Sequence, residues 1–232
     1  MVLAGKVFNV RGKIELDTIV AKLKGYQVEK AFEYENRSIM LLTEIKDFTI
    51  TERSVQCTLS QDQVFNIYHR GQLIPTPKTI EAPIVFIQNK ESLMLIVLEK
   101  KQLANSIANL LSKILFITTG NIVESRIKSS TLKNFHEINY EDTKVIFFDD
   151  VDVPSISKLS LYGSELANTS LYAEYLTHGN IWYVVTKSKE YGYVIGLTRN
   201  SVVTAFSQVG KPEFLDYIIK EILPLVTRDM SE

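Results

Sequence analysis

Two similar stretches, roughly a hundred residues apart, decide the fold that we expect for this chain. The first is IVFIQNK at residues 84–90, and the second is IWYVVTK at residues 181–187. Each has the bulky residues of a strand, runs into a polar turn and is followed by a helical pattern. Two copies of one pattern at this spacing indicate an internal duplication. We therefore predict an α+β fold of two repeats, residues 1–118 and 119–232, each an antiparallel sheet with helices packed on one face.

The segments around these stretches extend the predicted repeat. In the first half, Ser60 and Gln63 form a capping pattern that predicts a short helix towards Tyr68, and the proline-rich stretch 71–83 is expected to be a loop. The matching part of the second half predicts a helix over 164–176. The remaining expected elements are strands at 2–14, 27–34, 38–45, 48–51, 55–59, 84–88, 93–98, 121–127, 144–151, 156–161, 181–186 and 191–197, and helices at 102–116, 130–136 and 212–227.

The composition is that of an ordinary globular protein, with 45% hydrophobic and 23% charged residues. The formal net charge is -1, so the chain has no overall basic field that would draw it to nucleic acid. The charge is uneven, because residues 1–118 hold 15 Lys and Arg against 12 Asp and Glu, whereas residues 119–232 hold 11 against 15. The sequence lacks a signal-peptide pattern and a membrane-spanning run, so we expect a cytoplasmic protein without membrane contact.

The single cysteine, Cys57, excludes an intrachain disulfide and a multi-cysteine zinc site. We expect it to be a small buried hydrophobic residue. Phosphate-binding glycine loops, nucleophile elbows and zinc spacings are also missing from the sequence. We expect no cofactor and no metal site.

Several short stretches resemble the TATA-box-binding protein family, whose saddle consists of two copies of a strand–helix–sheet–helix unit. Residues 13–20 (KIELDTIV) are similar to the first strand-to-helix transition of that family, and residues 84–90 and 181–187 are similar to its hairpins. Residues 121–123 (NIV) resemble the start of its second repeat, and Pro154 resembles a proline in that repeat. The resemblance implies a saddle-like fold and a transcription-related or nucleic-acid-related role.

The same resemblance suggests residues for a binding surface. Phe86 and Tyr183 match one member of each pair of wedge residues that the family inserts into the minor groove. Asn121 matches a groove-reading position, and Lys90 and Lys187 end the two hairpin stretches. We expect these five residues to form the binding site of a non-catalytic module for a protein partner or duplex DNA.

The chain departs from the family where DNA bending needs it most. The second wedge residues are replaced by Ser38 and Lys144, and Leu3 stands at the other groove-reading position. Basic residues beside the strands are replaced by Glu44 and by Asp149-Asp150, which would repel phosphates. We therefore do not expect TATA binding in the manner of the family.

An acidic run at residues 149–152 (DDVD) is the best enzymatic candidate. On a strand, Asp150 and Asp152 would share one face because side chains alternate. Such a carboxylate pair could hold Mg²⁺ for phosphodiester or phosphoryl-transfer chemistry. The other interpretation is a solvated strand edge whose charges discourage edge-to-edge pairing.

Two further patterns leave alternatives open. His69 and His178 precede glycines; we expect them to cap the ends of equivalent helices, and the alternative is a symmetric pair of imidazole metal ligands. Aromatic residues gather in the second half, where they can stack bases, form a protein-binding surface or pack across strands; they are Tyr172, Tyr175, Trp182, Tyr183, Tyr191 and Tyr193. A structural adaptor that forms a homodimer through exposed strand edges is the third function that we consider.

Overall fold

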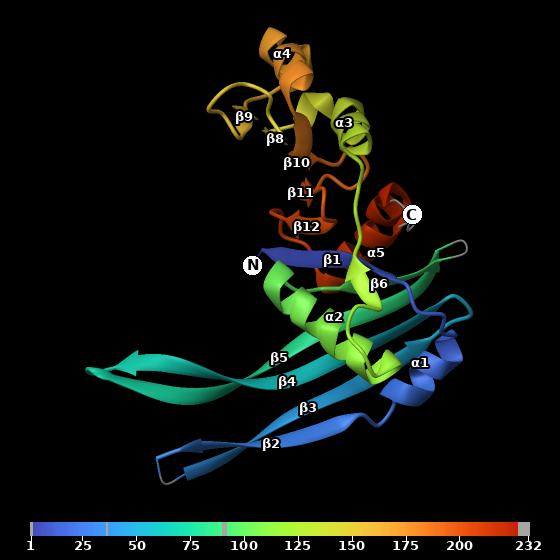
Figure 1. The fold of residues 1–232 in the computed structure, drawn as a ribbon, viewed down its shortest axis with the longest axis vertical. Coiled ribbons are helices and arrows are strands. Elements are labelled where there is room, and N and C mark those ends of the chain that lie inside the picture. Colours follow the sequence, from blue (N-terminus) through green and yellow to red (C-terminus); the bar gives the residue numbers. More distant parts are fainter. Residues whose placement is uncertain (1, 36, 90–91, 227–232) are drawn as a thin grey trace. The chain divides into compact units, whose positions relative to one another are not determined.

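The computed structural model describes residues 2–35, 37–89 and 92–226. This part of the chain contains five α-helices and twelve β-strands, and the strands pair antiparallel (Figure 1). The predicted α+β class is confirmed. No helix in these ranges is long and apolar enough to cross a membrane.

The chain divides into two compact units that combine distant segments. Unit 1 contains residues up to Asn9, Leu98–Ser106 and the chain from Val123 onward, and unit 2 contains Val10–Val97 and Ile107–Ile122. These boundaries differ from the halves 1–118 and 119–232 that the duplication pattern suggests. Each unit is therefore described by itself.

The sheet of unit 1 has the strand order β1-β12-β11-β10-β8-β9, and β7 pairs with β1. The strands are β1 (Leu3–Val10), β7 (Ile122–Glu124), β8 (Val145–Asp149), β9 (Leu159–Tyr162), β10 (Asn180–Lys187), β11 (Val194–Thr198) and β12 (Val202–Ala205). The helices are α3 (Ser129–Ile138), α4 (Ser170–His178) and α5 (Lys211–Tyr217), and α5 continues as a π-helical turn (Ile218–Ile222) and a 3₁₀ turn (Leu223–Leu225). Two more 3₁₀ turns cover Tyr140–Asp142 and Leu166–Asn168.

Helices cover one face of the unit 1 sheet. Phe148 of β8 contacts Tyr172 and Tyr175 of α4, with ring centroids 6.4 and 5.7 Å apart. Residues that pair across neighbouring strands point to the same side of the sheet. A row of paired residues, one from each strand from β9 to β12, therefore shares this face with Phe148: Leu161, Ile146, Val184, Leu197 and Val203. All five are buried. This row and Phe148 form the core of unit 1.

The sheet of unit 2 has the strand order β2-β3-β4-β5-β6. Its strands are β2 (Gln27–Tyr34), β3 (Arg37–Ile50), β4 (Ser54–His69), β5 (Gln72–Asn89) and β6 (Ser92–Val97). Its helices are α1 (Leu16–Leu23) and the part of α2 (Lys101–Phe116) that begins at Ile107. In Figure 1, α1 and this part of α2 lie on the same side of the sheet.

The core of unit 2 lies between its sheet and its helices. Cys57 pairs with Ile84 and Val55 pairs with Phe86 across β4 and β5, and all four side chains are fully buried. The buried residues of the helices are Ile19, Leu23, Ile107, Ala108, Leu111 and Leu115. Burial raises the pKa of the Cys57 thiol to about 12. The prediction that Cys57 is a buried hydrophobic residue is confirmed.

The predicted helix near 60–68 and the predicted loop at 71–83 are both wrong. Strands β4 and β5 form one continuous ladder down to the pair His69–Gln72. Arg70 and Gly71 close it, and both have positive φ, as a two-residue hairpin turn requires. The capping pattern at Ser60 misled the prediction, because β4 is paired with β5 throughout this stretch.

Prolines do not break β5, because they lie where one of its edges is unpaired. The pairing of β5 with β6 begins at Ile84, and the three prolines Pro75, Pro77 and Pro83 precede it. They are separated by even numbers of residues, so their nitrogen atoms point to the same edge of the strand. Since β5 pairs with β4 on its other edge, no ladder hydrogen bond is lost.

The order of elements also differs between the two halves of the sequence. The second half has the helix α4 where the first half has the β4–β5 hairpin, and its strand β12 was not predicted. The predicted helix 212–227 corresponds to α5 and the two short turns that follow it. The structure does not confirm a duplication.

Candidate functional site

The face of the unit 1 sheet that points away from its helices carries five aromatic side chains. We call it the aromatic face, and its residues are Phe147, Tyr162, Trp182, Tyr183 and Phe206. Tyr183 pairs with Phe147 of β8 and with Thr198 of β11. Because Phe147 alternates with the core residues Ile146 and Phe148, its ring points to the opposite side. The aromatic face therefore lies opposite the face that α4 covers; Tyr162 and Phe206 are exposed on it, and Phe147, Trp182 and Tyr183 are half-buried.

The rings on this face contact one another. The centroid of the Phe147 ring lies 5.9 Å from Tyr162, 5.7 Å from Trp182 and 5.4 Å from Tyr183. The centroids of Trp182 and Tyr183 are 5.8 Å apart. These separations are typical of favourable aromatic pairs. The rings hold one another in place, while Tyr162 keeps 68% of its surface exposed.

A β-bulge explains why Trp182 and Tyr183 lie together. The register between β10 and β8 shifts between Ile181 and Tyr183, so two residues of β10 lie opposite one residue of β8. The extra residue brings the Trp182 indole beside Phe147 instead of into the helix-covered core. Sequence alternation alone would have placed Trp182 and Tyr183 on opposite faces.

The Tyr183 ring packs directly against the backbone of Gly196 on β11. A Cβ atom at this position would lie 2.5 Å from the Tyr183 hydroxyl oxygen and 3.0 Å from the Phe206 ring. Only glycine lets both rings approach the backbone of β11 this closely. Burial raises the pKa of the Tyr183 phenol, and the neighbouring Tyr162 raises it further, so Tyr183 stays uncharged at neutral pH.

A pocket of about 270 Å³ lies at the end of the aromatic face, within unit 1. Its lining residues are Lys101, Asp149, Trp182, Thr198, Arg199, Asn200 and Val202. The indole nitrogen of Trp182 is buried and has no hydrogen-bond partner among the residues that the structure describes. The pocket thus joins an aromatic wall to amide, hydroxyl and charged groups.

Arg199, which follows β11, pairs with the acidic side chains at this pocket. Its guanidinium donates two hydrogen bonds to the Asp149 carboxylate, at 2.7 and 3.0 Å, and a third to Asp150 at 3.3 Å. The backbone nitrogen of Arg199 also donates to the carbonyl oxygen of Trp182 at 2.7 Å. This forked pairing fixes the guanidinium plane beside the aromatic face.

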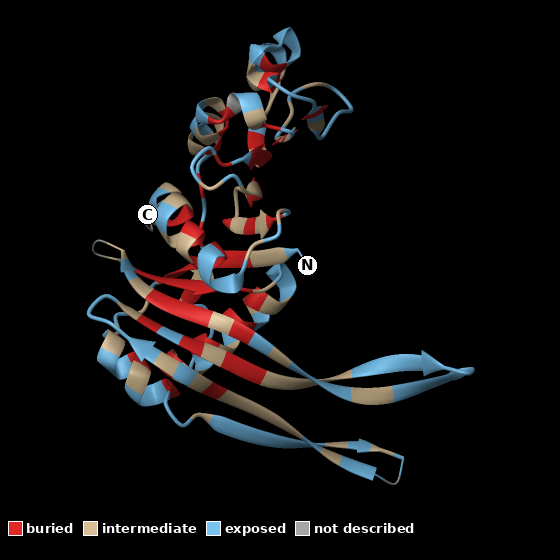
Figure 2. Cartoon of the chain, turned by 180° about the vertical axis from the view of Figure 1, so that it is seen from behind, coloured by how far each residue is buried: buried red, intermediate tan, exposed pale blue. Residues whose placement is uncertain are grey.

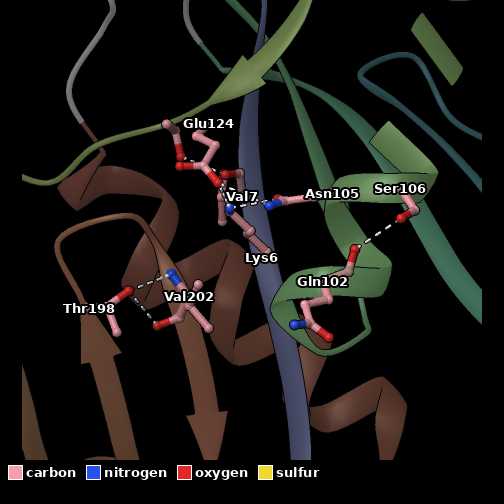
Figure 3. Close-up of polar contacts among 9 residues, drawn as sticks. Lys6, Val7, Gln102, Asn105, Ser106, Glu124, Thr198 and Val202 are labelled. Carbon is pink, nitrogen blue, oxygen red and sulfur yellow. Dashed lines mark hydrogen bonds and ion pairs between the residues drawn. The ribbon is translucent and has the colours of Figure 1, made fainter. Parts of the chain in front are cut away.

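A buried lysine lies on β1 beside the first turns of α2 (Figure 3). Lys6 is fully buried, and its ammonium group pairs with Glu124 and donates to Asn105 at 2.7 Å. Burial lowers the pKa of Lys6, although the hydrogen bond and charge of Glu124 oppose that shift. Burial alone would raise the pKa of Glu124, but Lys6 outweighs it and the pKa falls. Glu124 therefore stays ionised at neutral pH.

The predicted binding residues lie in different settings. Tyr183 lies on the aromatic face, and Lys187, exposed on the same strand, points to the same side. Phe86 is fully buried in the core of unit 2, facing the helices. Asn121 organises a turn of unit 2, where its side chain donates to Thr118 and its carbonyl accepts from Arg11. Lys90 lies outside the described residues.

The acidic run is divided between two partners, Arg199 and His178. Strand β8 ends at Asp149 and Asp150 has a positive φ, so the expected alternation of Asp150 and Asp152 on one strand face is wrong. Asp150 accepts from Arg199, whereas Asp152 lies 2.8 Å from Nδ1 of His178. Among the residues described, no group of three His, Cys, Asp or Glu side chains could hold a metal ion.

The two predicted helix-end histidines lie in different settings. His178 ends α4, as predicted, and its partner is the Asp152 carboxylate. His69 ends strand β4 rather than a helix, so its predicted role as a helix cap is wrong.

A third histidine is buried behind the sheet. Nδ1 of His136 lies 2.8 Å from the Thr143 hydroxyl oxygen, and its ring packs edge-on against Tyr172 with centroids 4.9 Å apart. Thr143 and Thr186 share the carbonyl oxygen of Asn139. Burial lowers the pKa of His136 to about 4, although the nearby Glu137 charge opposes the shift. This neutral imidazole is part of the unit 1 core.

Sequence reasoning missed several residues of the candidate site, above all Phe147, Tyr162, Lys158 and Arg199. Lys158 lies 5.2 Å from the centroid of the Trp182 ring, as a cation–π partner. Alternation in β8 could have identified Phe147, but the pairing of β8 with both β9 and β10 was needed to identify the others.

Comparison with known proteins gives no independent indication of function. No protein-family model matches the chain, and no curated protein is significantly similar to it. The functional argument therefore depends on the geometry of the site.

Proposed function

We propose that unit 1 is a non-catalytic binding module that takes up single-stranded nucleic acid on its aromatic face. The observation that carries this proposal is the row of mutually contacting rings on the side of the sheet opposite α4. Exposed aromatic rings on a sheet stack with bases, and each stacked base contributes about 1–3 kcal/mol to binding. The resemblance to the TATA-box-binding protein family implies a nucleic-acid-related role, and this face offers a physical basis for such a role.

Basic side chains around the rings support a phosphate-bearing ligand. Lys158 lies over Trp182, Lys187 is exposed beyond Tyr183 on β10, and Lys101 lines the pocket. Because Arg199 is neutralised by Asp149 and Asp150, the face carries only a modest positive charge. We therefore expect stacking to supply most of the affinity and phosphate contacts to add a moderate salt dependence.

The pocket beside Trp182 suits the edge of one base. Asn200 can exchange hydrogen bonds with ring nitrogens and exocyclic groups, and the Thr198 hydroxyl, which donates to the Val202 carbonyl, can accept one more. A base stacked on Trp182 would bring its polar edge to these groups. This contact would give the module a preference for one base at one position.

The other functions inferred from the sequence stay predictions. A saddle-like duplicated fold that binds duplex DNA would need both predicted wedge residues at the surface. Tyr183 lies on the aromatic face, but Phe86 is buried in the core of unit 2. A metal-dependent enzyme would need Asp150 and Asp152 to leave Arg199 and His178. A protein partner on the aromatic face is the strongest competitor, because Tyr and Trp are frequent anchors of protein interfaces.

Trp182 offers a direct test, because it is the only tryptophan of the chain. Titration with single-stranded RNA or DNA oligonucleotides should quench its fluorescence, and the quenching should weaken as salt rises. The same oligonucleotide in duplex form should bind more weakly, because its bases are already stacked. Tight duplex binding would instead support the saddle prediction.

Two matched tyrosines supply the variant and its control. Tyr162 on the aromatic face is 68% exposed, and Tyr68 on the β4–β5 hairpin is 72% exposed. Tyr162→Ala should weaken oligonucleotide binding by about fivefold to a hundredfold, whereas Tyr68→Ala should leave it unchanged. If no oligonucleotide quenches Trp182 at low salt, or if both variants bind as the parent protein does, the proposed function is wrong.

A further inference from the structure

The outer part of the β4–β5 hairpin exposes apolar residues without a core of its own. We call residues 62–80 the arm. Figure 2 shows its ribbon as mostly exposed, in contrast to the buried middle of the unit 2 sheet. Its large apolar residues are between 41% and 72% exposed; they are Phe65, Ile67, Tyr68, Leu73 and Ile74. An isolated two-stranded ribbon is only marginally stable in water, so this arm is a candidate for burial against a partner.

Both faces of the arm are apolar. Ile67 pairs with Ile74 on one face, and Tyr68 pairs with Leu73 on the other. On the first face the Lys78 ammonium lies 5.9 Å from the Phe65 ring centroid. A strand with one apolar face would suit a helix or a sheet packed on that side. A strand apolar on both faces suits continuation of the sheet itself, because side chains on both faces then gain neighbours.

One edge of the arm is open for such continuation. The ladder between β3 and β4 ends at the pair Thr43–Gln61. At the next position the Asp62 carboxylate accepts from the backbone nitrogen of Leu42 at 3.0 Å, so a side chain takes the place of a backbone acceptor. Beyond it the two hairpins diverge (Figures 1 and 2). Residues 62–69 have no ladder partner on this edge within the described ranges.

The charges of the arm favour a second copy of the same chain. Between Gln63 and Pro77 the only fully charged side chain is Arg70, at the tip, and Asp62 lies at the base. If two β4 edges pair antiparallel about a twofold axis, the tip of each arm lies beside the base of the other. Arg70 of one copy then meets Asp62 of the other, which makes the contact self-complementary.

The exposed area matches a weak dimer. A fully exposed side chain of this size presents roughly 200 Å², so the three apolar residues of the pairing strand β4, Phe65, Ile67 and Tyr68, together present roughly 300 Å² per arm. Two β4 edges together bring roughly 600 Å² of exposed apolar side chain, and the backbone hydrogen bonds between the edges add to this, which is the size of a weak, transient interface. We infer that the arm binds the arm of a second copy by antiparallel pairing of residues 62–69, which joins two unit 2 sheets into one.

Sedimentation equilibrium over a wide range of protein concentration tests this inference. The parent protein should form a concentration-dependent dimer. The triple variant Phe65→Thr, Ile67→Thr, Tyr68→Thr keeps β-forming residues but removes the apolar contacts. It should raise the dimer dissociation constant by roughly a hundredfold or more. The matched control changes Ile117, Ile138 and Tyr162, all strongly exposed outside the arm, to Thr and should leave the dimer intact.

Cross-linking provides a second measurement that does not depend on how the triple variant folds. In the antiparallel register, Asn66 lies next to the twofold axis, so Asn66→Cys should form an intermolecular disulfide under mild oxidation. Cys57 is buried and its raised pKa keeps it unreactive. A monomer at every concentration, a dimer that survives the triple substitution, or arm-dependent binding to lipid vesicles without dimerisation would each overturn the inference.

Discussion

The aromatic face of unit 1 and the arm of unit 2 both expose large apolar side chains on strands, but their supports differ. The rings of the aromatic face sit on a sheet whose other side is packed against α3 and α4. The arm has open solvent on both faces beyond the fork at Asp62. Exposed rings on a rigid support are already positioned for a ligand. Exposed residues on an unsupported ribbon gain order only when a partner completes the sheet.

The two surfaces differ in the packing that supports the exposed residues, and much less in the type or exposure of those residues. Tyr162 and Tyr68 are almost equally exposed strand tyrosines. We assign them to different partners because Tyr162 contacts Phe147, whereas Tyr68 lies opposite Leu73 on the arm. Substitutions at matched residues of the two units therefore test whether this difference in support holds.

The largest effect is expected for a matched pair of phenylalanines. Phe148 is fully buried between β8 and α4, whereas Phe65 on the arm is 43% exposed. Phe148→Ala should lower the free energy of unfolding of unit 1 by about 3–5 kcal/mol, because it leaves a cavity in the core. Phe65→Ala should change the stability of the monomer by less than about 0.5 kcal/mol. Urea denaturation at low protein concentration measures both.

Equal effects of Phe148→Ala and Phe65→Ala would contradict the comparison. A small effect at Phe148 would mean that α4 does not cover the sheet, and the aromatic face would lose its support. A large effect at Phe65 would mean that the arm already belongs to the monomer core.

Acid should destabilise unit 1 through His136. Its pKa of about 4 in the folded protein lies below the usual value of 6.5, so the unfolded chain binds more protons between these two values. Stability is therefore fully present above about pH 6.5 and falls as the pH drops towards 4, by roughly 3 kcal/mol in all. The change should appear in chemical denaturation of unit 1 at a series of pH values.

Substitution separates the contribution of His136 from general acid effects. The charged and titratable groups near His136 are Glu137 on its own helix and the phenol of Tyr172 on α4. His136→Gln should remove most of the pH dependence between 4 and 6.5. His69→Gln, at an exposed position of unit 2, serves as the control. A pH profile that His136→Gln leaves unchanged would show that the imidazole is not buried in neutral form.

A smaller effect is expected for a matched pair of glutamates. Glu124→Ala leaves the buried Lys6 ammonium with Asn105 as its hydrogen-bond partner, and should cost about 1–3 kcal/mol. Glu81 pairs with the exposed Lys46 at 2.9 Å, and Glu81→Ala should leave the unfolding midpoint unchanged within error. Thermal unfolding of the two variants at equal ionic strength makes the comparison.

The buried lysine itself offers a control for this prediction. Lys6→Met fills a similar volume without a charge and leaves Glu124 free to be solvated, so its cost should stay below that of Glu124→Ala. A larger loss in Lys6→Met than in Glu124→Ala would show that the ammonium group, rather than its burial without a partner, determines the local stability.

Much of the fold could be predicted because its signals are local. The helix α2 and the strands β2 and β10 follow from apolar spacing over a few residues, and Cys57 is buried as its type suggests. The hairpin β4–β5 was missed, because its prolines and its Arg70-Gly71 turn are informative only when the paired edges are known. The aromatic cluster near Trp182 was recognised, but the rings of Phe147 and Tyr162 were not.

Local patterns in the sequence were enough to predict the α+β class, the positions of most strands and helices, and the concentration of aromatic residues in the second half. The exposure of those rings, the burial of Phe86 and the pairing of Arg199 with Asp149 became visible only in the folded chain. The physical reason is that local periodicity defines two faces for each strand without saying which face is covered. Coverage depends on long-range pairing, and a bulge such as that at Trp182 moves a side chain to the other face without any local signal.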